Sequence, residues 1–243
     1  KEIVSSSYTP LSYFYWTEQN KNLVTQIIPR ASSFASNGNI NIATSFVNLN
    51  DFRHYPTLAY STNMLIPEEN WVAQTSPFSI IYECIWVSVF NMFIAVGHTS
   101  TGYPIAYSYN GINWLVDNSS LVFNYGYNIA LKESRVVAIG ENSSIIYSDN
   151  GIVWSLANTS EIVGTFYPND IAASDKIFVV VGAGDTQFAY SYDGITWHGL
   201  NITFFFETRT IEWSIILNRF VAGGYNALPL EWVVYEQYTN GSL

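Results

Sequence analysis

The chain has 243 residues, of which 49% are hydrophobic and 17% aromatic, and its 9 basic and 19 acidic side chains give a net charge of −10. This length is enough for one domain with a large core, and the acidic balance excludes the basic surface that nucleic-acid binding requires. No apolar run reaches the roughly 20 residues of a membrane-spanning helix, so no membrane span is expected within this chain.

The first part of the chain predicts short strands and turns. Residues 1–30 are expected to form a hairpin with strands at 12–17 and 23–28. Residues 31–79 form a less regular module, with strands expected at 39–47 and 57–61. These segments are rich in β-branched and aromatic residues, which favour strands.

Three modules of one design follow. In each, an apolar first strand precedes a second strand that ends in small apolar residues and a glycine. The first strands are predicted at 84–89, 128–132 and 170–173, and the terminal glycines are Gly97, Gly140 and Gly182. A partial module repeats this pattern from residue 211 onward. No segment has a helical period, and apolar runs of this length with glycine ends indicate buried strands.

The third strand of each module runs into a repeated stretch, Tyr-Ser-Tyr-Asp-Gly-Ile-Thr-Trp at 190–197, with close variants at 107–114 and 147–154. Asp-Gly and Asn-Gly favour tight turns because glycine adopts positive φ without steric cost. The serine and Asp or Asn side chains can bond backbone N–H groups within the turn, and the tryptophan can pack beneath it. We predict structural corners built from Ser108, Asn110, Gly111, Trp114, Ser148, Asn150, Gly151, Trp154, Ser191, Asp193, Gly194 and Trp197.

The spacing of these corners indicates a repeat protein. Their glycines, Gly111, Gly151 and Gly194, recur every 40 to 43 residues, and a weaker copy ends at Gly241. A period of about 40–50 residues suits a four-stranded propeller blade. The pattern Ser-x-Asp/Asn-Gly-x-x-Trp resembles the Asp-box, or bacterial neuraminidase, repeat of sialidase-like β-propellers, with one residue fewer between the acidic residue and the tryptophan. The resemblance covers roughly residues 84–243.

We therefore predict an all-β protein, a single β-propeller domain over 1–243 built from four-stranded antiparallel blades. Its Asp-box turns should lie between strands 3 and 4 of each blade. Partial modules included, about six blades are expected, with five to seven allowed; the modules are 1–30 (partial), 31–79, 80–123, 124–165, 166–208 and 209–243 (partial). We also expect the chain to be a piece of a longer protein or a larger assembly.

Resemblance to sialidases would imply an arginine triad, a Tyr–Glu nucleophile pair and an aspartate acid/base. The Arg-Ile-Pro signature of that family is absent, and Arg135 and Arg219 fall at equivalent turn positions. A general glycosidase needs two carboxylates at a set separation, and the loop candidates are Asp51, Glu68, Glu69 and Asp185. Whether the chain is an enzyme stays open, and we assign no catalytic residue.

Other reactive side chains give no pattern of a cofactor or metal site. The single cysteine, Cys84, lies in an apolar run and is expected to be a buried thiol. The histidines have no metal-ligand spacing; they are His54, His98 and His198. We therefore assign no cofactor-binding and no metal-binding residue.

Five Asn-x-Ser/Thr sequons occur, three of them four residues after the tryptophan of a corner. They predict glycosylation at Asn118, Asn142, Asn158, Asn201 and Asn240. Glycans at these positions would indicate an extracellular protein.

These patterns favour a non-catalytic extracellular module for surface contact, adhesion or attachment, on a cell envelope or a virion. A surface rich in Tyr, Asn, Ser and Thr suits protein or glycan partners. The variable loops between strands 2 and 3 are the expected contact face, with Tyr55, Tyr103 and Tyr225. A sialidase-like glycoside hydrolase or lyase would instead place carboxylates and arginines near the axis, and an intracellular interaction scaffold would leave its sequons unmodified.

Overall fold

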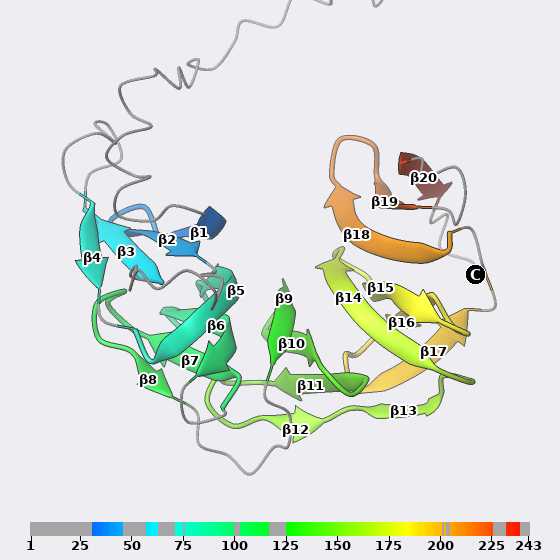
Figure 1. The fold of residues 1–243 in the computed structure, drawn as a ribbon, viewed down its shortest axis with the longest axis horizontal. Coiled ribbons are helices and arrows are strands. Elements are labelled where there is room, and N and C mark those ends of the chain that lie inside the picture. Colours follow the sequence, from blue (N-terminus) through cyan, green and yellow to red (C-terminus); the bar gives the residue numbers. More distant parts are fainter. Residues whose placement is uncertain are drawn as a thin grey trace, which may run out of the picture.

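The computed structural model describes residues 31–45, 57–62, 71–74, 76–99, 103–116, 125–200, 202, 205–225 and, by backbone alone, 232–238. Every regular element in these ranges is a β-strand, and the sheets stand side by side as an open arc (Figure 1). The predicted fold class, a β-propeller of four-stranded antiparallel blades, is confirmed. The expected hairpin at 1–30 lies outside the described residues.

Five sheets, which we call blades 1 to 5, follow one another in chain order within the described residues. Blade 1 contains β1 (Ala31–Ser36), β2 (Asn41–Ser45), β3 (Leu58–Ser61) and β4 (Val72–Gln74). Blade 2 contains β5 (Phe78–Val87), β6 (Met92–Thr99), β7 (Ile105–Ser108) and β8 (Leu115–Val116). Blade 3 contains β9 (Gly126–Lys132), β10 (Arg135–Gly140), β11 (Ser144–Ser148) and β12 (Ser155–Leu156).

Blades 4 and 5 depart from the four-stranded pattern. Blade 4 contains β14 (Phe166–Ala173), β15 (Phe178–Gly184), β16 (Phe188–Ser191) and β17 (Thr196–Leu200), with β13 (Asn158–Glu161) added parallel to β17. Blade 5 has three described strands, β18 (Glu207–Ser214), β19 (Arg219–Tyr225) and β20 (Trp232–Tyr238). The expected module 124–165 therefore differs from blade 3, because β13 pairs with the following blade. The chain crosses outside blade 4 before it enters that blade at β14.

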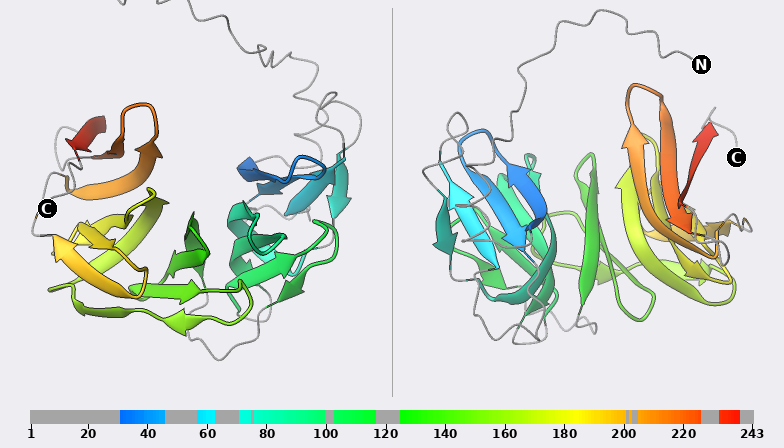
Figure 2. Two further views of the ribbon diagram at one scale, coloured as in Figure 1. Left: turned by 180° about the vertical axis from the view of Figure 1, so that it is seen from behind. Right: turned by 45° about the horizontal axis from the view of Figure 1, so that its top comes forward.

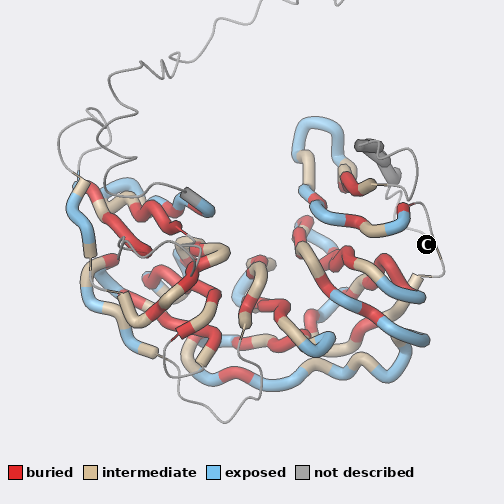
Figure 3. Tube along the Cα trace, viewed as in Figure 1, coloured by how far each residue is buried: buried red, intermediate tan, exposed pale blue. Residues whose placement is uncertain are grey.

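The first strands of the blades, which we call the inner strands, lie next to one another. Contacts join β1 to β5, β5 to β9, β9 to β14 and β14 to β18. Burial is highest on the second and third strands, the inner strands are mixed, and the fourth strands β4, β8 and β12 are largely exposed (Figure 3). Cys84 on β5 is a free, buried cysteine, and burial raises the pKa of its thiol well above the ordinary value.

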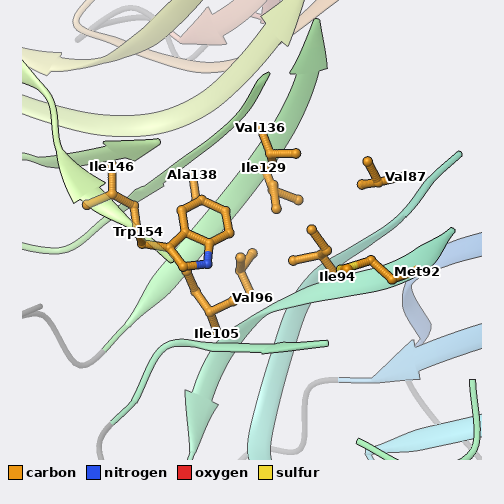
Figure 4. Close-up of a cluster of buried hydrophobic side chains, with 10 residues drawn as sticks. All are labelled: Val87, Met92, Ile94, Val96, Ile105, Ile129, Val136, Ala138, Ile146 and Trp154. Carbon is orange, nitrogen blue, oxygen red and sulfur yellow. The ribbon is translucent and has the colours of Figure 1, made fainter. Parts of the chain in front are cut away.

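The four larger hydrophobic clusters of described residues each lie between two blades, and a small one, Ala43 and Ala59 with Trp71, lies within blade 1. Between blades 2 and 3, Met92, Ile94 and Val96 meet Val136 and Trp154 (Figure 4). Equivalent clusters join blades 1 and 2, 3 and 4, and 4 and 5. Burial of this apolar surface is the main favourable term that holds adjacent blades together.

Antiparallel blades give the molecule two distinct ends (Figure 2). The turns between strands 1 and 2 and the repeated corners between strands 3 and 4 lie at one end, the corner end. The connections between strands 2 and 3 and the links from one blade to the next lie at the other, the link end. Of the expected contact residues, Tyr103 and Tyr225 belong to the link end.

Candidate functional site

Every inner strand carries a β-bulge at the same position. The extra residue is Ser32, Tyr82, Tyr127, Asn169 or Arg209. The residue directly after each bulge is polar, and these residues are Ser33, Glu83, Asn128, Asp170 and Thr210. Bulges re-aim side chains locally, and here they bring one polar residue from each blade to the same level of the inner strands.

Two of the glycines predicted to end the second strands, Gly97 and Gly182, lie within those strands and opposite these bulges. A Cβ on Gly182 would lie 2.0 Å from the carbonyl oxygen of Tyr167, and a Cβ on Gly97 would lie 2.0 Å from that of Ile80. Both contacts are with backbone atoms of the bulged inner strand. Glycine is therefore needed because the two backbones approach too closely for any side chain.

Asp170 connects three blades at this level. One carboxylate oxygen accepts from Asn128 Nδ2 at 2.5 Å and from the N–H of Ile171 at 2.8 Å. The other accepts from Thr210 Oγ1 at 2.9 Å and from the N–H of Ile211 at 2.8 Å. Burial raises the pKa of Asp170 despite these hydrogen bonds. The side chain thus satisfies inner-edge N–H groups that have no neighbouring strand to pair with.

Glu83 has a similar role between blades 1 and 2. The hydroxyl of Ser33 donates to Glu83 Oε1, which also accepts from the N–H of Cys84 at 3.1 Å. Burial raises the pKa of Glu83, and these hydrogen bonds lower it by less.

A cavity of about 460 Å³ opens among the inner strands of blades 2 to 5. Its carboxylates are Glu83, Asp170 and Glu212, beside Asn128 and Thr210. None of the basic side chains that the structure describes lines this cavity. The carboxylates expected for an enzyme are therefore present in this cavity. The arginines expected beside them are not, because none of the described arginines lines it.

Of the loop carboxylates suggested by the sequence, Asp185 is described and does not line this cavity. Asp185 is exposed in a turn, where one oxygen accepts the N–H and the hydroxyl of Thr165, both at 2.9 Å. Asp51, Glu68 and Glu69 lie outside the described residues. The sequence analysis did not identify Glu83, Asp170 or Glu212, although a polar residue at an equivalent place in each apolar inner strand was a usable signal.

Aromatic side chains cluster at the link end, where blades 2 and 3 meet. Tyr82 and Tyr127 form an edge-to-face pair with ring centroids 5.8 Å apart. His98 stacks on Tyr125 at 4.4 Å with an angle of 14° between the rings. In each pair the first ring belongs to blade 2. The second ring is Tyr127 of β9 in blade 3, or Tyr125, which directly precedes β9. Burial raises the pKa of Tyr82 and of Tyr127.

His98 is also fixed by a serine. The hydroxyl of Ser79 donates to the carbonyl oxygen of His98 at 3.0 Å and contacts His98 Nδ1 at 2.8 Å. These two contacts hold the His98 ring in place beside Tyr125.

A second polar and aromatic group lies at the link end of blade 5. Tyr225 donates its hydroxyl to Glu207 at 2.5 Å, and Arg209 pairs with Glu207 at 2.8 Å. The Arg209 guanidinium lies 5.5 Å from the centre of the Tyr225 ring. Of the expected contact residues, Tyr225 thus belongs to a network and Tyr103 is half-buried between β6 and β7. Tyr55 lies outside the described residues.

The three corners share one hydrogen-bonding scheme. In the third, Asp193 Oδ1 accepts the N–H groups of Ile195 and Thr196 at 2.8 and 2.9 Å and the hydroxyl of Ser191 at 3.0 Å. Asn110 and Asn150 bond their corners in the same way. The corner glycines have φ of 69°, 72° and 73°.

The corners also bind each blade to the one before it. A Cβ on Gly194 would lie 2.8 Å from Val137 of blade 3, and Arg135 donates to the carbonyl oxygen of Asp193 at 2.6 Å. Trp197 is fully buried in the cluster between these blades. Gly194 and Trp197 of the corner therefore pack blade 4 against blade 3.

The remaining expected residues are dispersed. Asn142 lies exposed in the β10–β11 turn with φ of 55°, and Asn158 is exposed at the start of β13. Asn118, Asn201 and Asn240 lie outside the described residues. Arg135 pairs with Asp149 at 2.8 Å, and Arg219 donates to the carbonyl of Leu217 at 3.3 Å, so the two arginines do not converge on one site.

Two further facts concern possible site classes. Within the described ranges, no three His, Cys, Asp or Glu side chains are grouped so that they could hold a metal ion. The described part of the chain also has no helix long and apolar enough to cross a membrane.

No protein-family model matches the chain, and no curated protein sequence matches it. Solved structures do match it. A structure of YCF48 bound to D1 peptide has a TM-score of 0.54 and 14% identity over 82% of this chain, which spans 62% of that protein. The nidogen/laminin complex gives 0.58 and 8%, covering 85% of this chain and 75% of the matched chain. Virginiamycin B lyase from Staphylococcus aureus gives 0.61 and 11%, covering 87% and 71%. At such identities the likeness establishes the propeller fold alone.

Proposed function

We propose that this chain is a rigid, non-catalytic β-propeller that binds a protein or glycan partner through its link end. The observation that carries this proposal is the pair of aromatic contacts, Tyr82–Tyr127 and His98–Tyr125, across the border of blades 2 and 3. Aromatic rings that are already ordered offer large contact area at a small entropic cost. Tyr103 and Tyr225 extend the proposed contact face, and two of the similar structures are described as complexes, with laminin and with a D1 peptide.

The setting we propose is extracellular, on a cell envelope or a virion surface. Asn142 and Asn158 support it, because both sequons are exposed and open to modification. We further propose that the three corners are Asp boxes shortened by one residue, given their shared hydrogen-bonding scheme. Intact-mass measurement of native protein tests the location, and bare asparagine at every sequon would favour an intracellular scaffold.

Binding to a glycan array and to intact cells tests the contact face. The test variant carries Tyr82→Ser and Tyr127→Ser. Its matched control carries Tyr109→Ser and Tyr192→Ser, which remove two tyrosines that are 52% and 56% exposed at the corner end. We expect at least a tenfold loss of binding in the test variant alone, which corresponds to about 1.4 kcal/mol. Equal binding by both variants would place the contact face elsewhere.

A glycoside hydrolase or lyase remains the alternative, and it would use the central cavity with Glu83 as its acid, since its pKa is raised. Turnover of chromogenic glycosides tests it. Activity that is lost in Glu83→Gln, with the fold unchanged, would replace the binding proposal.

A further inference from the structure

The turn between β18 and β19 differs from its equivalents at the corner end. Its tip is Ile215-Ile216-Leu217, with side chains that are 84%, 95% and 45% exposed. The corresponding turns of blades 3 and 4 carry Glu133-Ser134 and Asp175-Lys176, and that of blade 2 carries Ser88-Val89-Phe90, in which only Val89, at 56%, is an exposed aliphatic residue. Three consecutive exposed aliphatic residues are unfavourable in water and indicate a contact surface.

The tip is held outward by its own turn. The N–H of Leu217 donates to Ser214 Oγ at 3.2 Å, and Asn218 has a positive φ of 51°. Asn91 has a φ of 52° at the same place in the four-residue turn of blade 2. The backbone of the tip therefore matches that of the blade 2 turn, and the tip differs from it in having three exposed aliphatic side chains in a row.

A groove of about 470 Å³ lies directly beside the tip. Leu131, Ala173, Trp213 and Ile215 form its apolar lining, and Lys132, Glu133 and Asp175 form its charged rim. The same surface thus contains a projecting apolar knob at Ile216 and an adjoining hollow large enough for an aliphatic side chain.

We propose that this surface pairs with the same surface of a second copy about a two-fold axis. In such an interface each patch faces its own copy, so a knob must find a hollow on the same patch. Ile216 of each copy would occupy the groove of the other. This pairing lies at the corner end and is independent of the contact face at the link end.

The distribution of charge makes this surface a better place for a second copy to bind than the other surfaces of the chain. The whole chain carries −10, so most surfaces of two copies repel each other. Of the five basic side chains among the described residues, four flank the turns at this end: Lys132, Arg135, Lys176 and Arg219. They are mixed with Glu133, Asp149, Asp175 and Asp193. Local balance of charge lets two copies approach here, and mixed signs allow opposite charges to face each other.

A lipid bilayer is the other surface that an aliphatic tip could enter. Glu133 and Asp175 beside the tip, together with the overall charge, oppose approach to anionic headgroups. The hollow next to the tip would also have no occupant on a flat membrane. The observations therefore favour the second copy.

Sedimentation equilibrium of the whole chain tests the proposal. We expect wild type to reach a dimer mass as its concentration rises. Ile216→Asp should weaken self-association by about a hundredfold, because the interface would have to bury an unpaired carboxylate. Val163→Asp is the matched control, since Val163 is 78% exposed in the β13–β14 link, away from the corner end. At concentrations where wild type is monomeric, both variants should keep the wild-type melting temperature, because neither side chain is packed in the monomer.

Several results would overturn the proposal. One is a wild-type chain that stays monomeric at every concentration. Another is a dimer that Ile216→Asp and Val163→Asp weaken equally. Flotation of a monomeric wild type with phosphatidylcholine vesicles, lost in Ile216→Asp, would assign the tip to a bilayer instead. A photocrosslinker at position 216 that reacts only within its own copy would assign the tip to an internal contact.

Discussion

Asn128 and Asp170 lie on adjacent inner strands, and the amide of Asn128 donates to a carboxylate oxygen of Asp170 at 2.5 Å. Each residue directly follows a β-bulge, so the two are structurally equivalent. Each also accepts the N–H of the next residue, Ile129 at 2.6 Å and Ile171 at 2.8 Å. A polar residue after the bulge therefore satisfies its own strand edge and connects it to the next blade.

Replacing Asp170 with Ala should destabilise the fold by about 2–4 kcal/mol, because four donors at the centre lose their acceptor. Urea unfolding measures the change. Asp175→Ala, at an exposed turn position, is the control and should stay within about 0.5 kcal/mol of wild type. Equal stability of the two variants would contradict the role given to Asp170.

The fold was predictable from sequence, whereas the centre of the molecule was not. The corners repeat the same residue types at a fixed spacing, because Ser191, Asp193 and Gly194 each have a local geometric task. The polar residues of the inner strands all form hydrogen bonds between adjacent blades, but their side chains differ: Ser33 has a hydroxyl, and Glu83 and Asp170 have carboxylates. A bulge also shifts the alternation of each inner strand by one residue, which hides these positions from a period-two pattern.

The strand β13 could not be identified from the sequence, for a related reason. Its sequence, Asn-Thr-Ser-Glu, has no apolar alternation, so nothing local marks it as a strand. It is a strand because the N–H of Asn158 donates to the carbonyl of Ile195 at 2.7 Å and His198 pairs with Glu161 at 2.7 Å. Such tertiary pairing overrides local preference.

The three corner tryptophans should differ in their contribution to stability. Trp197 is 0% exposed and Trp154 4%, whereas Trp114 is only partly buried. Trp197→Ala should cost about 3–5 kcal/mol, Trp154→Ala nearly as much, and Trp114→Ala clearly less. Denaturant unfolding of the three variants gives the order, and a largest loss at Trp114 would contradict it.

Phenylalanine variants isolate the hydrogen bond of the indole. Trp197 Nε1 donates to the carbonyl of Gly194 at 3.3 Å, but Trp154 Nε1 is buried without a partner among the described residues. Trp197→Phe should therefore cost about 1 kcal/mol more than Trp154→Phe. The same unfolding experiment measures both, and the reverse order would show that packing alone decides the cost.

A close backbone approach should make Gly182 irreplaceable. In Gly182→Ala the new methyl would lie 2.0 Å from the carbonyl oxygen of Tyr167, so the bulge must shift or break. We expect a loss of about 3 kcal/mol or more, at the upper end for overpacking. Gly199→Ala is the control, because its nearest heavy atom would be 3.2 Å away. Thermal unfolding that lowers the melting temperature equally in both would contradict the explanation.

Acid should weaken the third corner more than the other two, because Asp193 titrates and Asn110 and Asn150 do not. Burial acts to raise the pKa of Asp193, but the N–H groups of Thr196 and Ile195 and the hydroxyl of Ser191 together lower it below its ordinary value. A carboxyl whose folded-state pKa is lowered adds stability above its unfolded pKa of about 3.9 and loses it as the pH falls through the folded value.

Asp193→Asn keeps the acceptor oxygen and removes the proton equilibrium. Its unfolding free energy should therefore fall less steeply than that of wild type as the pH drops below about 4. The reciprocal variant, Asn150→Asp, should acquire an additional acid-dependent loss, because its Oδ1 already accepts from Ile152 and Val153 at 2.9 and 2.8 Å. Urea unfolding at several pH values measures both slopes. If Asp193→Asn and wild type lose stability in parallel below pH 4, the corner carboxylate does not stabilise the fold through its ionised form.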